Sequence, residues 1–483
     1  MTFAPADLLR LLPEIVLAIF GVVVMVADPF VSRPHKHHLG TLALVGTIAA
    51  FAATAVQAQY AGMAFSRMMT VDAFSVFMHF LILLVTGLTI LASFRYLDRE
   101  EIHCGEYYAL LLFATIGMGL MVAANELVLI FLGLEISSIA TYILAGFRRT
   151  ALRSNEAAMK YFLLGSFATA FLLYGIALMF GATGTTFLGD VRAVLEGGQA
   201  NLTLTWMAVA LLFVGLAFKV ASVPFQVWTP DVYEGAPAPV TAFLSVGPKA
   251  AAFAAFLRIF FIALEPLANQ WFWLIWVSAV LTMFVGNLAA LVQTNVKRML
   301  AYSSIAHAGY ILIAFAAGNE FGIAAVLFYL VAYALMKLGA FSVVAHVSGS
   351  GEERVSIEDY TGLGSRQPLV AACFSVFLFS LIGVPLTGGF LGKLYIFRAA
   401  LDAGSTELVW LVVFGAINTA ISIYYYLRVV IAMYFREPRG EVSLAPLPAS
   451  LAFVLTFAAL VTIYLGLASP VLQLATDSAL ALR

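Results

Sequence analysis

The 483-residue chain is predicted to be an all-α polytopic membrane protein with about fourteen transmembrane helices. Hydrophobic residues make up 63% of it and charged residues 11%, whereas soluble domains carry about 25% charged residues. Prolines interrupt one apolar segment in each half of the chain. Such paired interruptions are typical of transporters built from internal repeats. We therefore predict a single membrane domain, 1–483, with two inverted repeats that each contain a broken helix.

The individual spans follow from windows of about 20 apolar residues, the length that crosses the hydrocarbon core. The first window lacks a basic segment before it and is long enough to span, so it is predicted to be a retained helix. Such windows lie near residues 8–29, 39–59, 72–94, 106–123, 126–147, 156–180, 204–222, 239–264, 271–293, 300–317, 321–347, 369–401, 408–434 and 449–469.

The two interruptions divide the chain into the predicted repeats. Residues 215–249 read GLAFKVASVPFQVWTPDVYEGAPAPVTAFLSVGPK, and Pro224 should end the helix before it. The window 369–401 is too long for one straight crossing and contains Pro385 followed by two glycines. One break in each half predicts a first bundle over 106–264 and a second over 271–435.

Basic residues set the predicted orientation. They gather in alternate loops, which the positive-inside rule places in the cytoplasm. Both termini are then predicted to lie on the periplasmic side of the bacterial inner membrane. The long polar loop 348–368 would be cytoplasmic, and it is too short to form a catalytic domain. The basic residues concerned are Arg33, Lys36, Arg95, Arg99, Arg148, Arg149, Arg153, Lys297, Arg298, Arg354, Arg366, Arg436 and Arg439.

Several kinds of site are not expected in this chain. The net charge of −1 argues against nucleic-acid binding. Cys104 and Cys373 are the only cysteines, whereas an iron–sulfur cluster takes about four. Neither G-x-G-x-x-G nor G-x-x-x-x-G-K occurs, so no nucleotide site is predicted. His35, His37 and His38 stand in a basic loop without a carboxylate or cysteine, which argues against a metal site.

Glu135 is the acidic candidate for function, because it lies in the middle of an apolar span. Ser138 and Tyr142 follow at i+3 and i+7 and share its helix face. Ionisable residues inside the membrane are candidates for function by default. The alternative is a carboxyl group that burial keeps protonated and that bonds a neighbouring hydroxyl.

Three lysines lie near the predicted breaks. Lys219 and Lys249 flank the first break, and Lys393 follows the second. Their position predicts charge movement inside the membrane. The alternative is that long side chains near helix ends reach the interface.

Two further residues are possible proton relays. Lys337 shares a helix face with Tyr329 and Tyr333, and His307 shares one with Ser303 and Tyr310. Histidine has a reference pKa near neutrality, which suits a proton carrier. A structural role for either residue is equally compatible with the sequence. His79 has no evident partner.

With these residues in place, the chain resembles the antiporter-like membrane subunits of respiratory complex I, the proton-pumping NADH:quinone oxidoreductase. Among these it is most similar to the subunit N group, the counterpart of mitochondrial subunit 2. The resemblance covers essentially the whole chain and rests on VPFQVWTPDVYEGAPAPVTAF, the span around Glu135, and YSSIAHAGY. Lys393, where a sister subunit has glutamate, favours the subunit N group.

The resemblance implies a function and an assembly. Glu135 would pair with Lys219, Lys249 would be the central lysine and Lys393 the terminal one. The chain would translocate protons as a non-redox subunit, coupled to quinone reduction elsewhere in the complex. Flavin, iron–sulfur clusters and quinone would be bound by other subunits, and membrane subunits would flank the chain within the lipid bilayer.

Two alternatives remain at this point. The first is a subunit of a multisubunit cation/proton antiporter, which shares this architecture by resemblance. The second is a scaffold that binds lipid or quinone and moves no protons. A scaffold has no need of charged groups in the middle of the membrane.

Overall fold

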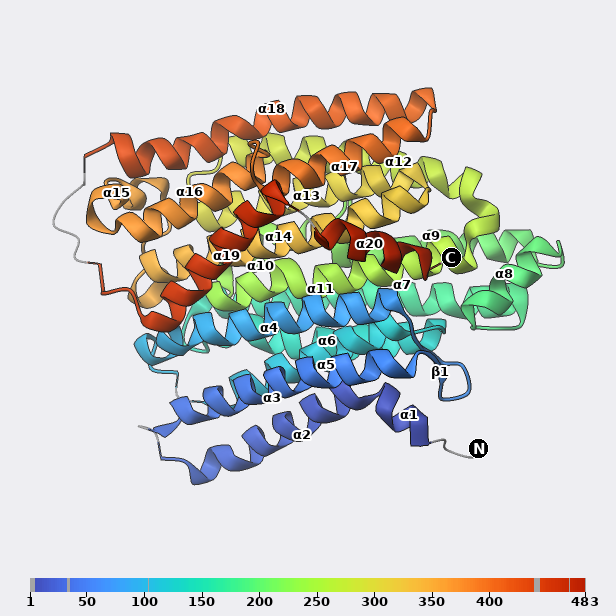
Figure 1. Cartoon of the computed structure of the whole chain (residues 1–483), viewed down its shortest axis with the longest axis horizontal. Helices are drawn as coiled ribbons and strands as arrows, with labels where there is room; N and C mark the ends of the chain where they lie inside the picture. The colour runs from blue at the N-terminus through green and yellow to red at the C-terminus, as the bar shows by residue number, and fades with distance from the viewer. Residues whose placement is uncertain (1–4, 33–34, 103, 438–443, 469, 483) are drawn as a thin grey trace.

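The computed structural model describes residues 5–32, 35–102, 104–437, 444–468 and 470–482, and almost every element in them is a helix (Figure 1). The elements are α1 (Pro5–Arg10), α2 (Leu12–Ala27), α3 (His37–Gln57), β1 (Gly62–Ala64), β2 (Met69–Val71), α4 (Ala73–Arg99), α5 (Glu106–Ala123), α6 (Leu127–Ala145), α7 (Leu152–Thr183), α8 (Leu188–Glu196), α9 (Leu202–Val220), α10 (Trp228–Gly235), α11 (Ala238–Arg258), α12 (Ala268–Leu291), α13 (Val296–Ala317), α14 (Glu320–Val347), α15 (Leu363–Arg366), α16 (Pro368–Ile382), α17 (Gly388–Asp402), α18 (Thr406–Phe435), α19 (Ala449–Leu467) and α20 (Pro470–Leu480).

The predicted membrane spans are confirmed. Within the described residues, thirteen helices are long and apolar enough to cross a membrane. The remaining predicted span, 369–401, is divided between α16 and α17, which have 15 residues each. The chain is therefore a multi-pass membrane protein with an all-α fold.

Asparagine side chains directly precede several helices and cap their first turn. Asn201, Asn295 and Asn319 accept hydrogen bonds from backbone N–H groups three residues later, at 3.2, 3.2 and 2.6 Å. These bonds satisfy donors that the first helical turn leaves unpaired. Each of these asparagines therefore fixes the residue at which its helix begins.

Both predicted breaks are present. α9 ends at Val220, and a loop containing Pro224 leads to the short α10 before α11 begins. In the second half, α16 ends at Ile382 and α17 begins at Gly388, after Pro385. A Cβ atom at Gly389 would lie 1.8 Å from the backbone oxygen of Ser380. The second break therefore brings two backbone segments closer than any side chain allows.

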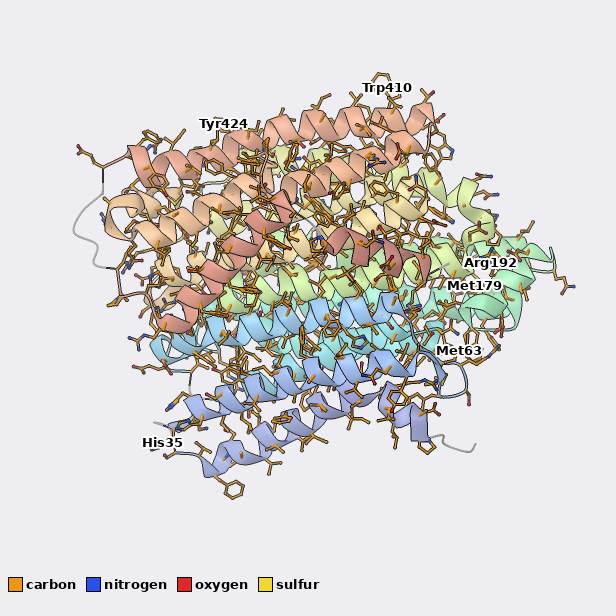
Figure 2. All side chains as sticks on the ribbon, viewed as in Figure 1. His35, Met63, Met179, Arg192, Trp410 and Tyr424 are labelled. Carbon is orange, nitrogen blue, oxygen red and sulfur yellow. The ribbon has the colours of Figure 1, made fainter. Side chains whose placement is uncertain are left out.

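The two termini lie at the same end of the bundle, on the right in Figure 1. Figure 2 places Met63 and Arg192 toward that end and His35 at the opposite end. The basic residues Arg99, Arg148 and Lys297 contact glutamates at the end away from the termini. Of the basic residues used for the orientation, Arg33 and Arg439 lie outside the described residues.

Several short elements were not predicted from hydropathy, among them the following two. A hairpin pairs β1 with β2, with Gly62 opposite Val71, and α20 follows α19 and packs against α14 and α4. Both are shorter than the windows that identify a membrane span. Periodicity in such short segments is a weak signal, so the sequence did not reveal them.

The helices in the centre of the bundle are α11, α13 and α14. The most apolar segment of each helix is 89% buried within the chain in α11, 94% in α13 and 89% in α14. The corresponding segment of α2 is 28% buried. Polar side chains on these three helices therefore face protein and not lipid. This burial positions the candidate site described below.

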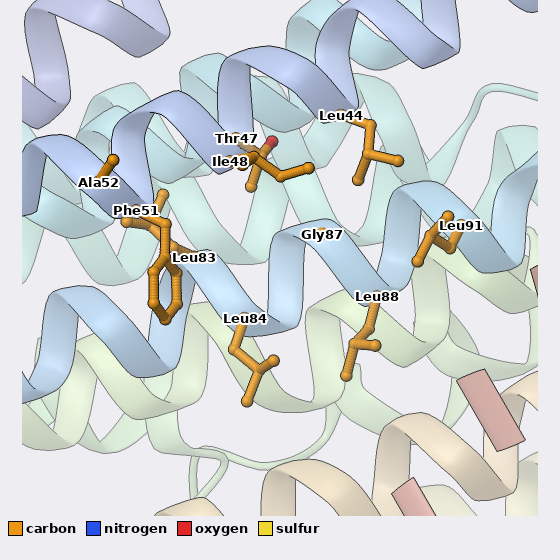
Figure 3. Close-up of a pocket in the computed structure, with 10 residues that line it drawn as sticks. All are labelled: Leu44, Thr47, Ile48, Phe51, Ala52, Leu83, Leu84, Gly87, Leu88 and Leu91. Atoms are coloured by element: carbon orange, nitrogen blue, oxygen red, sulfur yellow. The ribbon is translucent and has the colours of Figure 1, made fainter. Parts of the chain in front are cut away.

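The lateral face between α3 and α4 contains an apolar groove of about 450 Å³ (Figure 3). Its lining is Leu44, Thr47, Ile48, Phe51, Ala52, Leu83, Leu84, Gly87, Leu88 and Leu91. The Thr47 hydroxyl donates to the Ala43 carbonyl at 2.9 Å within its own helix. The groove therefore presents apolar surface throughout.

Candidate functional site: buried lysines and their hydroxyl partners

Lys219 lies in the last turn of α9, directly before the first break, and is 7% exposed. Its ammonium group donates to the Ser138 hydroxyl at 2.7 Å and reaches the Tyr142 hydroxyl at 3.5 Å. It also lies 5.2 and 5.4 Å from the ring centres of Tyr142 and Tyr161. The polar face predicted on α6 therefore surrounds this ammonium group.

Glu135 and Lys219, the predicted functional pair, are not in direct contact in the structure. No ion pair within 4 Å joins the two among the described residues, and the buried Glu135 Oε1 has no hydrogen-bond partner there. Ser138, one turn along α6, provides the hydrogen bond instead.

Lys249 lies in the middle of α11 and points at α13. Its ammonium group donates to the Ser304 hydroxyl at 2.7 Å and to the Ser304 carbonyl oxygen at 2.9 Å. The Ser304 hydroxyl also bonds the Tyr333 hydroxyl on α14 at 2.6 Å. Lys249 is thus connected to two neighbouring helices through one serine.

Lys337, on α14, contacts the preceding serine of α13. It donates to the Ser303 hydroxyl at 2.8 Å and to the Leu300 carbonyl at 2.7 Å, and it is fully buried. The Ser303 hydroxyl is also hydrogen-bonded to the hydroxyl of Tyr426 on α18. The polar face predicted around Lys337 therefore lies inside the bundle.

His307 lies between two tyrosine hydroxyls. Its Nδ1 is 2.5 Å from the Tyr329 hydroxyl and its Nε2 is 3.2 Å from the Tyr426 hydroxyl. Through Tyr426 and Ser303 it is connected to Lys337.

Lys393 lies in the first turns of α17, beside the second break. It donates to the carbonyl oxygens of Leu381 and Ile382 at 3.1 and 2.8 Å. These carbonyls end α16, where the helix dipole favours a positive charge. The ammonium group also lies 3.5 Å from the Thr419 hydroxyl and 4.6 Å from the ring centre of Tyr310.

The structure thus brings Lys249, Lys337 and His307 to one hydroxyl-lined region, with Lys219 and Lys393 beside the two breaks. We call these five residues the lysine line. Sequence reasoning missed the bridging hydroxyls, which are Ser304, Tyr426 and Thr419. The consecutive serines in YSSIAHAGY were the one available signal, since adjacent helical residues face different neighbours.

An ionic cluster lies outside the lysine line, at the end of the bundle away from the termini. Glu352 accepts from Lys297 at 2.6 Å and from the Tyr96 hydroxyl and the Ala238 backbone N–H at 2.6 Å each. Burial alone would raise the pKa of Glu352, but Lys297 and these hydrogen bonds hold that pKa below its ordinary value. The cluster attaches loop 348–368 to the first residues of α11.

A second charged group surrounds the first break at the same end. Asp231 of α10 accepts from Lys160 at 2.7 Å and from Arg298 at 2.8 Å. Partial burial would raise the pKa of Asp231, but these two cations lower it. Together with Arg153 and Glu234 they line a polar cavity of about 210 Å³.

His79, for which the sequence indicated no partner, has one in the structure. Its Nε2 lies 2.7 Å from the carboxyl group of Glu14, a residue 65 positions earlier in the chain.

In the described part of the chain, no three histidine, cysteine, aspartate or glutamate residues are grouped so that they could hold a metal ion.

Comparison with known proteins decides the family. Residues 124–422 match the family described as "NADH:quinone oxidoreductase/Mrp antiporter, TM". The chain is 51% identical to NADH-quinone oxidoreductase subunit N 1 of Solibacter usitatus, over 100% of this chain and 99% of that one. The chain belongs to the NADH-quinone oxidoreductase subunit N family. The resemblance inferred from the sequence is thereby confirmed.

Solved structures of other membrane complexes share the fold of this chain. A chain of respiratory complex I from Thermus thermophilus is 36% identical, with a TM-score of 0.80, and the match covers 94% of this chain and 97% of that one. A chain of the Mrp complex from Dietzia is 23% identical, with a TM-score of 0.87 over 98% of this chain and 97% of that one. The second likeness shows a shared fold.

Proposed function

We propose that this chain is the proton-translocating membrane subunit N of a bacterial NADH:quinone oxidoreductase. Protons would move through Glu135, Lys219, Lys249 and Lys393, with His307 and Lys337 as relays. The observation that carries the proposal is the lysine line itself. Five basic side chains, each 7% exposed or less, lie inside an apolar bundle and are bonded to hydroxyl or carbonyl groups.

The hydrogen-bond pattern supports relay chemistry because hydroxyl groups both donate and accept. A proton on Lys249 has Ser304 and Tyr333 within reach, and one on Lys337 has Ser303, Tyr426 and His307. A purely structural lysine needs only acceptors. Lys249 and Lys337 instead contact hydroxyl groups of α13, which can also donate a proton. Such groups are not needed merely to stabilise a buried positive charge.

Glu135 would control the charge of Lys219 without contacting it. Two unit charges 4 Å apart interact by about 4 kcal/mol at an effective dielectric constant of about 20. At twice that distance about 2 kcal/mol remains, comparable with the roughly 2.3 kcal/mol needed to move a charge against 100 mV. The electrostatic interaction between two charges at that separation is thus strong enough to act as a switch without direct contact.

The remaining parts of the proposal concern organisation. We infer that the bundles over 106–264 and 271–435 are two inverted repeats, each containing one break. Both termini would lie on the periplasmic side, since the basic loops gather at the other end. Other membrane subunits would flank the chain on both sides, and the chain itself would be non-redox. Flavin, iron–sulfur clusters and quinone would be bound elsewhere in the complex.

The two alternatives predict different behaviour. An antiporter subunit would carry sodium or potassium in exchange for protons, and its partners would include no flavin or iron–sulfur protein. A scaffold would keep its activity when the buried lysines are made neutral. The 51% identity to a subunit N over the full length favours the complex I assignment over an antiporter.

The test is proton pumping by the purified, reconstituted complex with Lys249→Met. We expect assembly at the wild-type level and a loss of quinone reduction coupled to proton uptake. Lys36→Met is the matched control, because Lys36 is an interfacial lysine paired with Asp28 at 2.8 Å. Equal pumping by both variants, or co-purification without redox subunits, would exclude the proposed function.

A further inference from the structure

A second group of ionisable side chains lies inside the bundle, away from the lysine line. Glu14 of α2 and His79 of α4 are joined by a 2.7 Å contact between Oε1 and Nε2, and both side chains are 4% exposed. Both helices are candidate membrane spans. Neither residue takes part in the function proposed above, and an acid–base pair in such surroundings is itself a candidate for function.

The partners of His79 fix where its protons can be. The Nδ1 atom lies 2.7 Å from the Ser75 carbonyl oxygen, which can only accept, so Nδ1 carries hydrogen. The contact between Nε2 and Glu14 Oε1 then holds a single proton. Either Nε2 donates it as imidazolium to a carboxylate, or the carboxylic acid donates it to a neutral imidazole. Both arrangements are neutral overall, which suits an apolar interior.

The other oxygen of Glu14 is not satisfied. Oε2 is buried and has no hydrogen-bond partner among the described residues. Gly119 of α5 borders the pair so closely that a Cβ atom there would lie 2.6 Å from Glu14 Oε1. A buried carboxylate oxygen without a donor is costly, and the cost disappears when that oxygen binds a proton or a water molecule.

Hydrogen bonds connect the pair to a partly exposed carboxylate. The carbonyl oxygen of Ser75 accepts the hydrogen bond from His79 Nδ1. The backbone N–H of Ser75 donates to the Asp72 carboxylate at 2.7 Å. The Asp72 side chain is 18% exposed and accepts two bonds of 2.9 Å from Arg258, the last residue of α11. Asp72 and Arg258 are thus the charged groups that this chain of hydrogen bonds reaches, and α11 also carries Lys249.

The pair lies near one end of the bundle. Glu14 is two residues into α2, and His79 is seven residues beyond Asp72, which is about 10 Å along a helix. This is the end that contains both termini. The distance to the aqueous phase on that side is therefore short compared with the roughly 30 Å of the hydrocarbon core.

We propose that Glu14 and His79 form a second protonation site, which holds one shared proton and exchanges it with water on the side of the termini. Release leaves a carboxylate beside a neutral imidazole and one hydrated proton outside. Uptake returns that proton to the Oε1–Nε2 contact. The exchange needs no other reactant. Its use in pumping rests on the function proposed above, whereas the site itself does not.

The test uses the intact complex in proteoliposomes. Glu14→Gln/His79→Gln keeps groups that can hydrogen-bond each other but removes both titratable groups. We expect normal assembly and a proton-pumping rate lowered on the order of tenfold, because a positioned proton-transfer group contributes a factor of about 100 when nothing replaces it and nearby water replaces it in part. The swap Glu14→His/His79→Glu restores an acid and a base and should recover pumping.

The matched control is Glu126→Gln. Glu126 is a buried carboxyl directly before α6, where it accepts from Leu129 N–H at 3.0 Å, and glutamine keeps an acceptor. Infrared difference spectra between H₂O and D₂O give a second readout, a carboxyl signal lost in Glu14→Gln and kept in Glu126→Gln. An infrared carboxyl signal that is unchanged in Glu14→Gln would overturn the second protonation site, and wild-type pumping by the double glutamine variant would overturn its use in pumping. A wild-type complex that pumps no protons would instead refute the function proposed above.

Discussion

Ser138 provides the hydrogen bond to the Lys219 ammonium group that a carboxylate would provide in a direct ion pair, at 2.7 Å. Glu135, one turn earlier on α6, leaves Oε1 buried and without a partner. A carboxylate in direct contact would hold the ammonium charge permanently, because breaking a buried pair is strongly unfavourable. A serine in that place lets the carboxylate influence the charge on Lys219 without fixing it.

Glu135 and Lys219 should therefore behave as one coupled pair. Glu135→Gln and Lys219→Met should each lower proton-coupled quinone reduction. The double variant should lose clearly less than the sum, with a coupling of about 0.5–3 kcal/mol. Activity in complexes assembled to the wild-type level is the measurement, and strictly additive losses would mean that the two groups act independently.

Position 393 should require a side chain that carries a positive charge and can release its proton. Lys393→Ala leaves the carbonyls of Leu381 and Ile382 without their donor and should slow pumping at least about tenfold, or about 1.4 kcal/mol. Lys393→Arg should retain more activity, since arginine keeps the charge but hardly releases its proton. Arg398→Ala is the control on the same helix, because its side chain is 64% exposed. Normal pumping by Lys393→Ala would show that Lys393 has a structural role only.

Glu352 should make the complex sensitive to acid. The folded pKa of this carboxyl lies below the unfolded value of about 4.3, so its stabilising contribution is complete above that value and is lost as pH falls through the folded pKa. Glu352→Gln leaves Lys297 buried without its counter-charge, which costs about 3–5 kcal/mol at neutral pH.

Thermal melting of the purified complex at neutral and acidic pH checks this expectation. Glu352→Gln should melt at a lower temperature at neutral pH and show a smaller further decrease in acid. Glu353→Gln changes the exposed neighbouring residue and should melt as wild type does. Identical melting of the two variants would contradict the role given to Glu352.

The orientation can be tested by cysteine labelling after the native cysteines are replaced by serine. With the termini in the periplasm, Ala403→Cys should react with an impermeant maleimide in intact spheroplasts. Glu353→Cys should react only after the membrane is opened. The reverse pattern would invert the orientation and with it the direction of pumping.

The sequence predicted the spans and both breaks because their signals are local. Apolar windows and the prolines at 224 and 385 act within a few turns of one helix. The partners of the buried charges depend on contacts between distant helices. His79 and Glu14 are 65 positions apart, and nothing near either one indicates the other. The same holds for Ser138, whose partner Lys219 lies beyond two intervening helices.

Ser303 and Ser304 are neighbours in α13, so their side chains point about 100° apart around its axis. Ser303 accepts a hydrogen bond from Lys337 of α14, and Ser304 accepts one from Lys249 of α11. A small rotation of α13 about its axis would move both hydroxyls together and change both lysine contacts at once. The two ammonium groups are therefore mechanically coupled through the orientation of one helix, in addition to any repulsion between their charges.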